Sequence, residues 1–337
     1  MSTNFPTSLD TFPSAATLAT HTLGTDPHST LHGNIGDTLA AVEAKVGVDA
    51  SAVTTSFDYN LKNIRPGISD GRLTLTSGTA VTTADVTGAT TVYFTPYKGS
   101  GISLYSTSAS KWYCYTFAEI SASLAGLTTS VPTDVFAYWT GSAVALELVN
   151  WTNGTTRATA LSSQDGVRTK SGDATRLYLG TICGSGAGTC EDSLAKRFVY
   201  NYYNQQNRKL YVTEPTNNWI YTTSTFRPIN NNTANRVEIV SGTGEEMIDL
   251  MVTGLNNLTV LGQSFVEIGV DSTTVNTLDY AVQTAIPGGF TPAFSQLRLY
   301  PTIGYHYYQG LEYGCTNGTE TWYGASVYAT VVGYYRG

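Results

Sequence analysis

A single stretch of this 337-residue chain has helical periodicity, and it limits what the chain can become. Within residues 31–62, Ile35, Leu39, Val42 and Val46 follow one another at intervals of four, three and four residues. This is the a/d spacing of a coiled-coil seam. A helix of two heptads is marginal in water by itself. The sequence therefore predicts a helix that needs partners, either from its own domain or from other copies of the chain.

One glycine and one serine predict where the helical stretch divides into two helices. Gly47 is expected to end the first helix at a C′ position. Ser51 is expected to cap a second, short helix that carries Val53, Phe57 and Leu61. We interpret the apolar residues of both helices as an oligomerisation and attachment element. An amphipathic helix packed on its own domain is the alternative.

The rest of the chain is poor in charge and rich in short β-branched runs. Charged residues make up only 13% of it, while Gly, Ser, Thr and Tyr are abundant. This pattern predicts a mainly β protein with two antiparallel β-sandwich or jelly-roll modules, and it excludes a disordered chain. The net charge of −7, without a Lys/Arg cluster, disfavours nucleic acid as a partner, and none is expected.

Turn-rich boundaries divide the chain into three predicted segments. Residues 1–66 are expected to form an extended arm and the helical segment, residues 67–214 a middle β module, and residues 215–337 a distal β-sandwich. Inside the middle module, residues 117–127 are predicted to form a short helix and residues 140–142 a tight hairpin turn.

No targeting or membrane segment is expected. The N-terminus MSTNFPTSLD has neither a basic region nor an apolar core, so it predicts no signal peptide. No apolar run approaches 18 residues, so no membrane insertion is predicted. We therefore expect the chain to be made in a cytoplasm.

Cysteine and histidine positions do not predict a metal or cofactor site. Cys183 and Cys190 flank the sequence GSGAGT, where a disulfide across a hairpin is geometrically possible, but a reducing compartment favours free thiols. Their spacing is not that of a zinc site. His28 and His32 would share a helix face, and hydrogen bonding is the favoured use of these two side chains over metal binding.

The known catalytic motifs are absent, so no catalytic residue is predicted. There is no GxSxG elbow, P-loop, HExxH or GxGxxG after a strand. Glycoside cleavage would need two carboxylates facing one sugar. The acidic residues available for this in the last third are Glu245, Glu246, Asp249, Glu267, Asp271, Glu312 and Glu320. A repetitive β-helix pattern is missing, so we expect a protein that is not an enzyme.

Tyrosine and tryptophan crowd the C-terminal part of the chain. Tyr307, Tyr308, Trp322 and Tyr323 are the candidate binding residues, because such side chains suit protein interfaces and stacking on sugars. Tyr307 and Tyr308 are adjacent, so in a strand they should face opposite sides. Trp322 and Tyr323 follow a predicted turn at Gly318 and are expected at a loop tip. The alternative for all four is a place in a core or a subunit interface.

The first two thirds of the chain resemble known virion proteins. The pieces FPTSLD, DPHSTLHG, AVEAKVGVD and SAVTTSFDYNLKN occur in the order of the N-terminal attachment region of tailed-bacteriophage appendage proteins. The segment from Asp70 to Ala118, which begins DGRLTLTSG, is similar to a β module that follows this region in such proteins. The match continues more loosely as far as RFVYNYYNQQNRKLYV, and the last third shows none.

This resemblance implies a function. It implies a homotrimeric tail fibre that binds other virion proteins through its N-terminal arm and a host-surface glycan or protein through its distal module. The chain would be located in the virion, on the tail or the head, after assembly in the host cytoplasm. The same attachment region also permits a capsid decoration or head fibre protein, and a polysaccharide-degrading tailspike is a further alternative. No cofactor is implied.

Overall fold

The computed structural model describes residues 28–47, 53, 55–62, 67–275, 277, 280–282 and 287–337. The chain divides into two compact units, Met1–Pro66 and Gly67–Gly337. The predicted extended arm lies outside the described residues.

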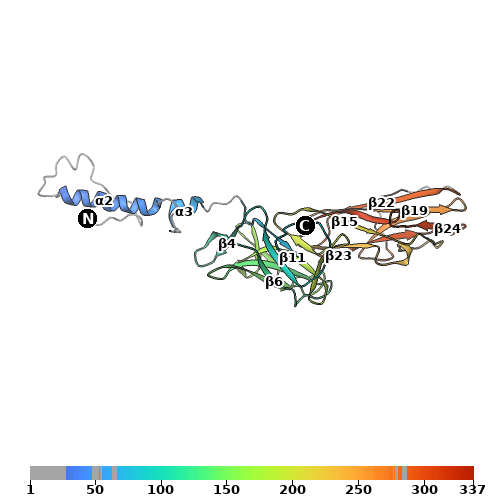
Figure 1. Ribbon diagram of the computed structural model, residues 1–337, viewed down its shortest axis with the longest axis horizontal. Coiled ribbons are helices and arrows are strands. Elements are labelled where there is room, and N and C mark those ends of the chain that lie inside the picture. The colour runs from blue at the N-terminus through green and yellow to red at the C-terminus, as the bar shows by residue number, and fades with distance from the viewer. Residues whose placement is uncertain are drawn as a thin grey trace. The chain divides into compact units, whose positions relative to one another are not determined.

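The first unit contains two helices, α2 (His28–Val46) and α3 (Phe57–Lys62) (Figure 1). The second helix is shorter than predicted, because Val53 precedes it and carries no helical structure. Gly47 ends α2 with a φ of 84°, and its N–H donates to the carbonyl of Glu43 at 2.8 Å. This confirms the predicted C′ glycine. The predicted cap of the second helix, Ser51, lies outside the described residues. Ser56 caps α3 instead, because its hydroxyl accepts a hydrogen bond from the Tyr59 N–H at 3.2 Å.

The chain is mainly β, as predicted: strands make up 52% of it and helices make up 7%. In the described part of the second unit, the largest sheet has thirteen strands and is curled. Its main path is β17 (Phe226–Pro228), β23 (Gly304–Tyr313), β18 (Arg236–Ser241), β13 (Lys196–Arg197), β12 (Thr189–Asp192), β11 (Asp173–Gly186), β10 (Val167–Lys170) and β9 (Leu161–Gln164). Five strands branch from it: β2 (Val86–Ala89), β7 (Pro132–Trp139), β8 (Val144–Asn150), β14 (Val199–Asn201) and β20 (Phe265–Val270).

The second largest sheet has seven strands. Its order is β15 (Asn207–Thr213), β25 (Thr330–Arg336), β19 (Ile248–Leu258), β22 (Phe290–Leu299) and β21 (Tyr280–Val282). Two further strands, β16 (Asn218–Ile220) and β24 (Glu320–Tyr323), pair with each other, and β24 also pairs with β19. Strand β25 therefore lies inside the sheet, hydrogen-bonded to β15 on one side and to β19 on the other.

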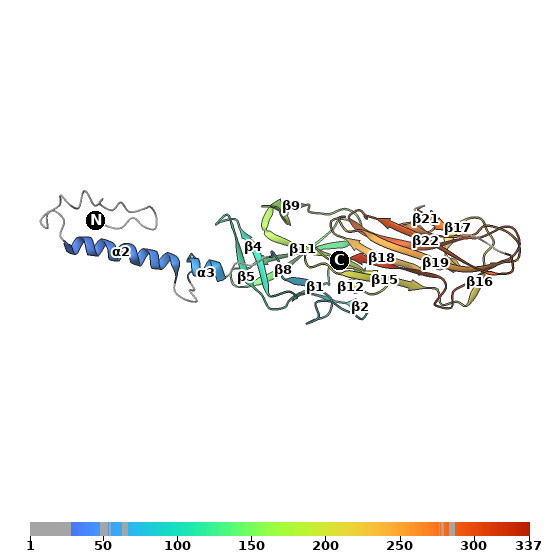
Figure 2. The same ribbon diagram turned by 90° about the horizontal axis from the view of Figure 1, so that it is seen from above.

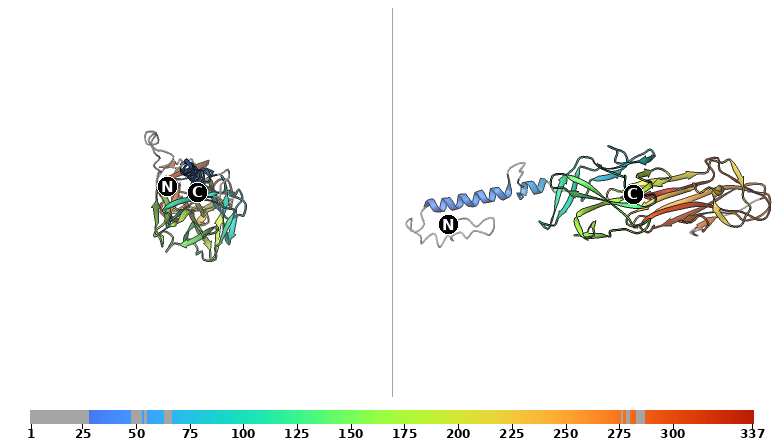
Figure 3. Two further views of the ribbon diagram at one scale, coloured as in Figure 1. Left: turned by 90° about the vertical axis from the view of Figure 1, so that its left-hand side faces the viewer. Right: turned by 90° about the horizontal axis from the view of Figure 1, so that it is seen from below.

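Two small sheets and a 3₁₀ helix complete the described elements of this unit. One sheet has the order β1 (Gly71–Thr74), β3 (Thr91–Pro96) and β6 (Ile120–Ser123), and the other pairs β4 (Gly101–Ser106) with β5 (Lys111–Thr116). The 3₁₀ helix η1 spans Ile229–Asn231. Strands β4 and β5 lie at one end of the unit and β16 lies at the other, with Gly337 between them (Figures 2 and 3).

The two large sheets face each other across an apolar core. Gly254 of β19 lies so close to β20 and β24 that an added Cβ would come within 2.7 Å of Val266 and 2.9 Å of Trp322. One continuous cluster of buried side chains fills the space between the sheets. Strands from both sides of the predicted boundary at residue 214 pair in the same sheets, as β13 does with β18 and β15 with β25.

Local predictions in the middle of the chain had mixed outcomes. The hairpin turn at residues 140–142 is confirmed, since the Thr140 N–H donates to the Ala143 carbonyl at 2.9 Å and Gly141 has a φ of 103°. The short helix predicted for residues 117–127 is wrong, because Ile120–Ser123 form β6 and pair with β3. Cys183 and Cys190 are free thiols buried in the core.

Candidate functional site

The apolar stripe of α2 is exposed along its whole length. Ile35, Leu39, Val42 and Val46 are 51%, 57%, 39% and 51% exposed. Val53 and Phe57, beyond the end of α2, are also exposed, and Leu61 lies in α3. Large apolar side chains in such a row favour association with another surface.

A second apolar surface covers the outer face of the seven-stranded sheet. Along β22 the residues Phe290, Pro292 and Phe294 point outward, and they alternate with buried residues. On the neighbouring strand β19, Leu255 is paired with Pro292 in register, and Met251 lies on the same face.

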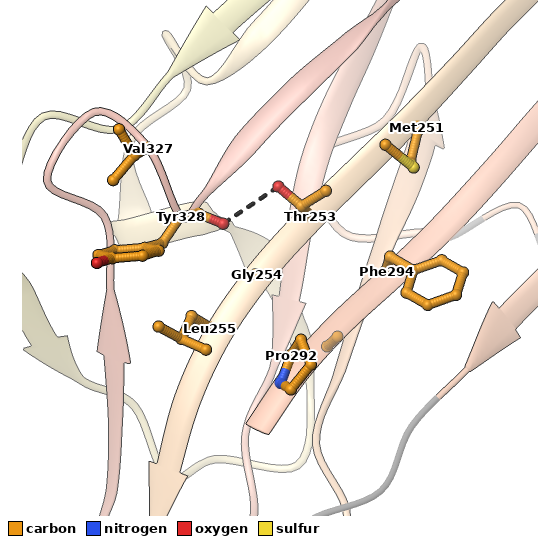
Figure 4. Close-up of a pocket in the computed structure, with 9 residues that line it drawn as sticks. Met251, Thr253, Gly254, Leu255, Pro292, Phe294, Val327 and Tyr328 are labelled. Carbon is orange, nitrogen blue, oxygen red and sulfur yellow. Dashed lines mark hydrogen bonds between the residues drawn. The ribbon is translucent and has the colours of Figure 1, made fainter. Parts of the chain in front are cut away.

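These outward residues and the β24–β25 connection enclose a groove of about 400 Å³. We call its exposed and half-buried apolar side chains the outer apolar patch: Met251, Leu255, Pro292, Phe294, Val327 and Tyr328. Figure 4 shows Leu255 and Pro292 between the rings of Tyr328 and Phe294. The Thr253 hydroxyl, at the floor of the groove, donates to the Tyr328 carbonyl at 3.1 Å and contacts the Thr330 hydroxyl at 2.8 Å.

Polar and aromatic groups border this patch. On one side, Asp249 accepts hydrogen bonds from Arg298 and Gln296, each at 3.0 Å. On the other side, the rings of Phe290 and Tyr323 meet edge to face, with centroids 5.1 Å apart. The arrangement is an apolar centre with a polar margin, which is typical of protein interfaces.

The four aromatic residues singled out in the sequence do not form one site. Tyr307 is half-buried and its ring lies under the Arg236 guanidinium at 4.7 Å, whereas Tyr308 is fully buried. The predicted alternation of these two neighbours is thus confirmed. Tyr323 is half-buried beside Phe290, as described above.

Trp322 is not at a loop tip. It lies in β24, 1% exposed, and its Nε1 has no hydrogen-bond partner among the described residues. The turn at Gly318 exists, with a φ of 84°, and it lies against the β19–β20 connection. In that connection, Val260 and Leu261 are apolar side chains that are 40% and 73% exposed. The sequence analysis did not select these two residues, because it chose binding candidates among the aromatic residues of this region.

The acidic residues of the last third are held in ion pairs and hydrogen bonds. Glu267, Glu312 and Glu320 are buried, and burial raises the pKa of all three carboxyls. Neither the groove described above nor a smaller one of about 290 Å³, lined by Arg157 and Arg168 among others, has a carboxylate in its wall.

Glu312 is the most perturbed of these groups. Burial raises its pKa to about 7, although the Arg227 charge and a hydrogen bond from Trp219 oppose the rise. Trp219 Nε1 donates to one carboxylate oxygen at 2.7 Å, and Arg227 Nε donates to the other at 2.8 Å.

We therefore expect the free energy of unfolding to fall as pH rises from about 4.5 to 7, because the folded chain keeps a proton on Glu312 that the unfolded chain releases. A rise of the pKa from 4.5 to about 7 corresponds to about 3 kcal/mol. Glu312→Gln should remove most of this slope, and Glu245→Gln, at an exposed carboxyl, should retain it. Urea unfolding across this pH range measures both; equal slopes for wild type and Glu312→Gln would contradict the prediction.

Two kinds of feature are absent from the described ranges, a metal-binding cluster and a membrane-spanning helix. There, no three His, Cys, Asp or Glu side chains come together in a way that could hold a metal ion. In the same ranges no helix combines the length and apolar character needed to cross a bilayer.

Comparison with known proteins adds no family. No protein-family model matches the chain, and no curated protein matches it. Among solved structures, BuGH86 in complex with neoagarooctaose is 12% identical over 73% of this chain and 32% of that one, with a TM-score of 0.20. A Bacillus thuringiensis Cry1Da tryptic core variant is 6% identical over 73% of this chain and 48% of that one, also with a TM-score of 0.20. The chain thus spans less than half the length of these structures, and neither likeness carries a functional argument.

Proposed function

We propose that this chain is a structural protein of a tailed-phage virion, a homotrimeric tail fibre or similar appendage. The observation that carries the proposal is the exposed stripe of Ile35, Leu39, Val42 and Val46 on α2. Its coiled-coil spacing suits the parallel association of identical helices, and burial of such a stripe between copies would stabilise them. Val53, Phe57 and Leu61 extend the same attachment element.

The second unit supplies the outward-facing part of the appendage. This unit, Gly67–Gly337, acts as the spacer and also presents the host-binding surface, from the part of it that residues 215–337 form. The mechanism is adhesion without catalysis, in which weak contacts from several copies add up to avidity. The resemblance of the N-terminal motifs to phage attachment regions supports this role.

Antibody labelling of intact virions tests the proposal. An antibody raised against the purified chain should label the tail of phage particles in electron micrographs. Label spread over the head would instead make the chain a capsid decoration or head fibre. Particles that carry no label at all would overturn a virion role.

The host-binding surface is expected at the loops beside β16 and β24. Leu261→Asp should lower the adsorption rate of phage to host cells about fivefold or more, as loss of a central interface contact does. It should change the stability of the fold by no more than about 0.5 kcal/mol, because the side chain is 73% exposed. The matched control is Met247→Asp. Met247 is also exposed, but it directly precedes the first residue of β19, whereas Leu261 follows the last. Equal adsorption by both variants and wild type would remove this loop from the surface.

A further inference from the structure

The outer apolar patch breaks the usual pattern of a sheet with one face in water. Strands of such a sheet alternate apolar residues inward and polar residues outward. Strand β22 alternates in burial, yet Phe290, Pro292 and Phe294 occupy its outward positions. With Met251 and Tyr328 beside them, Pro292 and Phe294 form a contiguous apolar surface around a groove, and Phe290 lies at its border. Surfaces of this kind mark sites of interaction with another molecule.

The chemistry of the patch favours a protein surface over a sugar. A polyol that leaves water must find new hydrogen bonds. The hydroxyl at the floor of the groove, that of Thr253, is already engaged with the Tyr328 carbonyl and the Thr330 hydroxyl. The lining residues otherwise offer aliphatic, thioether and aromatic groups, together with one phenol at Tyr328.

The charge of the margin does not oppose a second copy of this chain. Each chain carries a net charge of −7, so copies repel one another through most of their surface. At the patch the charges of Asp249 and Arg298 cancel within one ion pair of 3.0 Å. Two such patches can therefore approach without opposing like charges.

Association of copies through the stripe on α2 would also favour contact between the patches. Helices joined through that stripe hold their β units at a high effective concentration, at which even a weak contact between units is occupied. We propose that the outer apolar patch of each copy docks against the equivalent patch of its neighbours in the assembled oligomer. This inference rests on the proposed self-association through α2, and it assigns a second, separate interface.

Cross-linking of the full-length chain tests the contact. In a Cys114→Ser background the three remaining native thiols are buried. Phe294→Cys in this background should give covalent oligomers with a bis-maleimide reagent on denaturing gels. Leu261→Cys, an exposed apolar position outside the patch, should give far less. Equal yields from the two variants would overturn the inference.

A second variant measures the contribution to assembly. Phe294→Asp should raise the dissociation constant of the full-length oligomer about tenfold or more in sedimentation equilibrium, because it places a carboxylate in an apolar contact. Leu261→Asp should leave that constant unchanged.

The two proposals fail in different ways. A wild-type chain that stays monomeric at every concentration overturns both. An oligomer that is lost in Leu39→Asp but is unchanged in Phe294→Asp, with no cross-link at position 294, overturns only the docking of the patch. If Phe294→Asp instead lowers adsorption to host cells with assembly unchanged, the patch binds a host partner and the inference is wrong.

Discussion

Replacement of Leu39 by aspartate is expected to leave the purified chain monomeric while its β unit stays folded. Leu39 is one of the two middle residues of the α2 stripe and is 57% exposed in one copy, so its apolar contacts would come from other copies. Loss of a buried leucine side chain costs about 2–5 kcal/mol per subunit. Carboxylates brought together inside an apolar seam add a further penalty. Both costs make the free energy of association less favourable, and each chain in the oligomer contributes them.

Sedimentation equilibrium and circular dichroism test this expectation together. The mass should fall to that of a single chain, and the β signal and its unfolding midpoint in the monomer should persist. Ala44→Asp is the matched control, because five residues at 100° each place Ala44 on the side of α2 away from Leu39. An oligomer of unchanged stability in Leu39→Asp would refute self-association through this stripe.

The second large effect is expected at Trp322. Trp322→Ala should destabilise the second unit by about 3–5 kcal/mol, because it empties a large volume between the two main sheets. Trp322→Phe should cost much less, since it keeps most of the volume and removes an N–H that has no partner among the described residues. Urea unfolding of both variants measures these costs. A loss below about 1 kcal/mol for the alanine variant would contradict the packing described here.

This prediction also changes how adsorption data should be interpreted. A Trp322 variant that fails to bind host cells would reflect a damaged fold rather than a missing receptor contact. Tyr323, the next residue, is half-buried on the opposite face of β24. Tyr323→Ala therefore separates a surface effect from a stability effect more cleanly.

Sequence reasoning succeeded where local signals agreed with the final pairing. The stripe of α2 and the stop at Gly47 followed from spacing and from the conformational freedom of glycine. The turn between β7 and β8 followed from Thr140 and Gly141. The alternation of Tyr307 and Tyr308 followed from the period of a strand.

It failed where partners distant in sequence decide the structure. Phe117, Ile120, Leu124 and Leu127 have helical spacing, yet the segment between them pairs with β3 as strand β6. Trp322 sits near a genuine turn, but only the register of β24 on β19 shows that its ring points inward. The hairpin of β9 and β10 did carry a local signal, because Asp165-Gly166 at its turn both have positive φ.

The interior position of β25 has a consequence for synthesis in the cell. Its neighbours β15 and β19 precede it by more than seventy residues. During translation, the edge of each strand that pairs with β25 therefore stays unpaired until β25 is made. Pairing over such separations closes slowly and leaves strands open to aggregation. The seven-stranded sheet cannot be completed on the ribosome until residues 330–336 have emerged. A chain whose synthesis ends before that point would lack β25, so the edges of β15 and β19 that β25 occupies would stay unpaired. Such edges can pair with a strand of another chain.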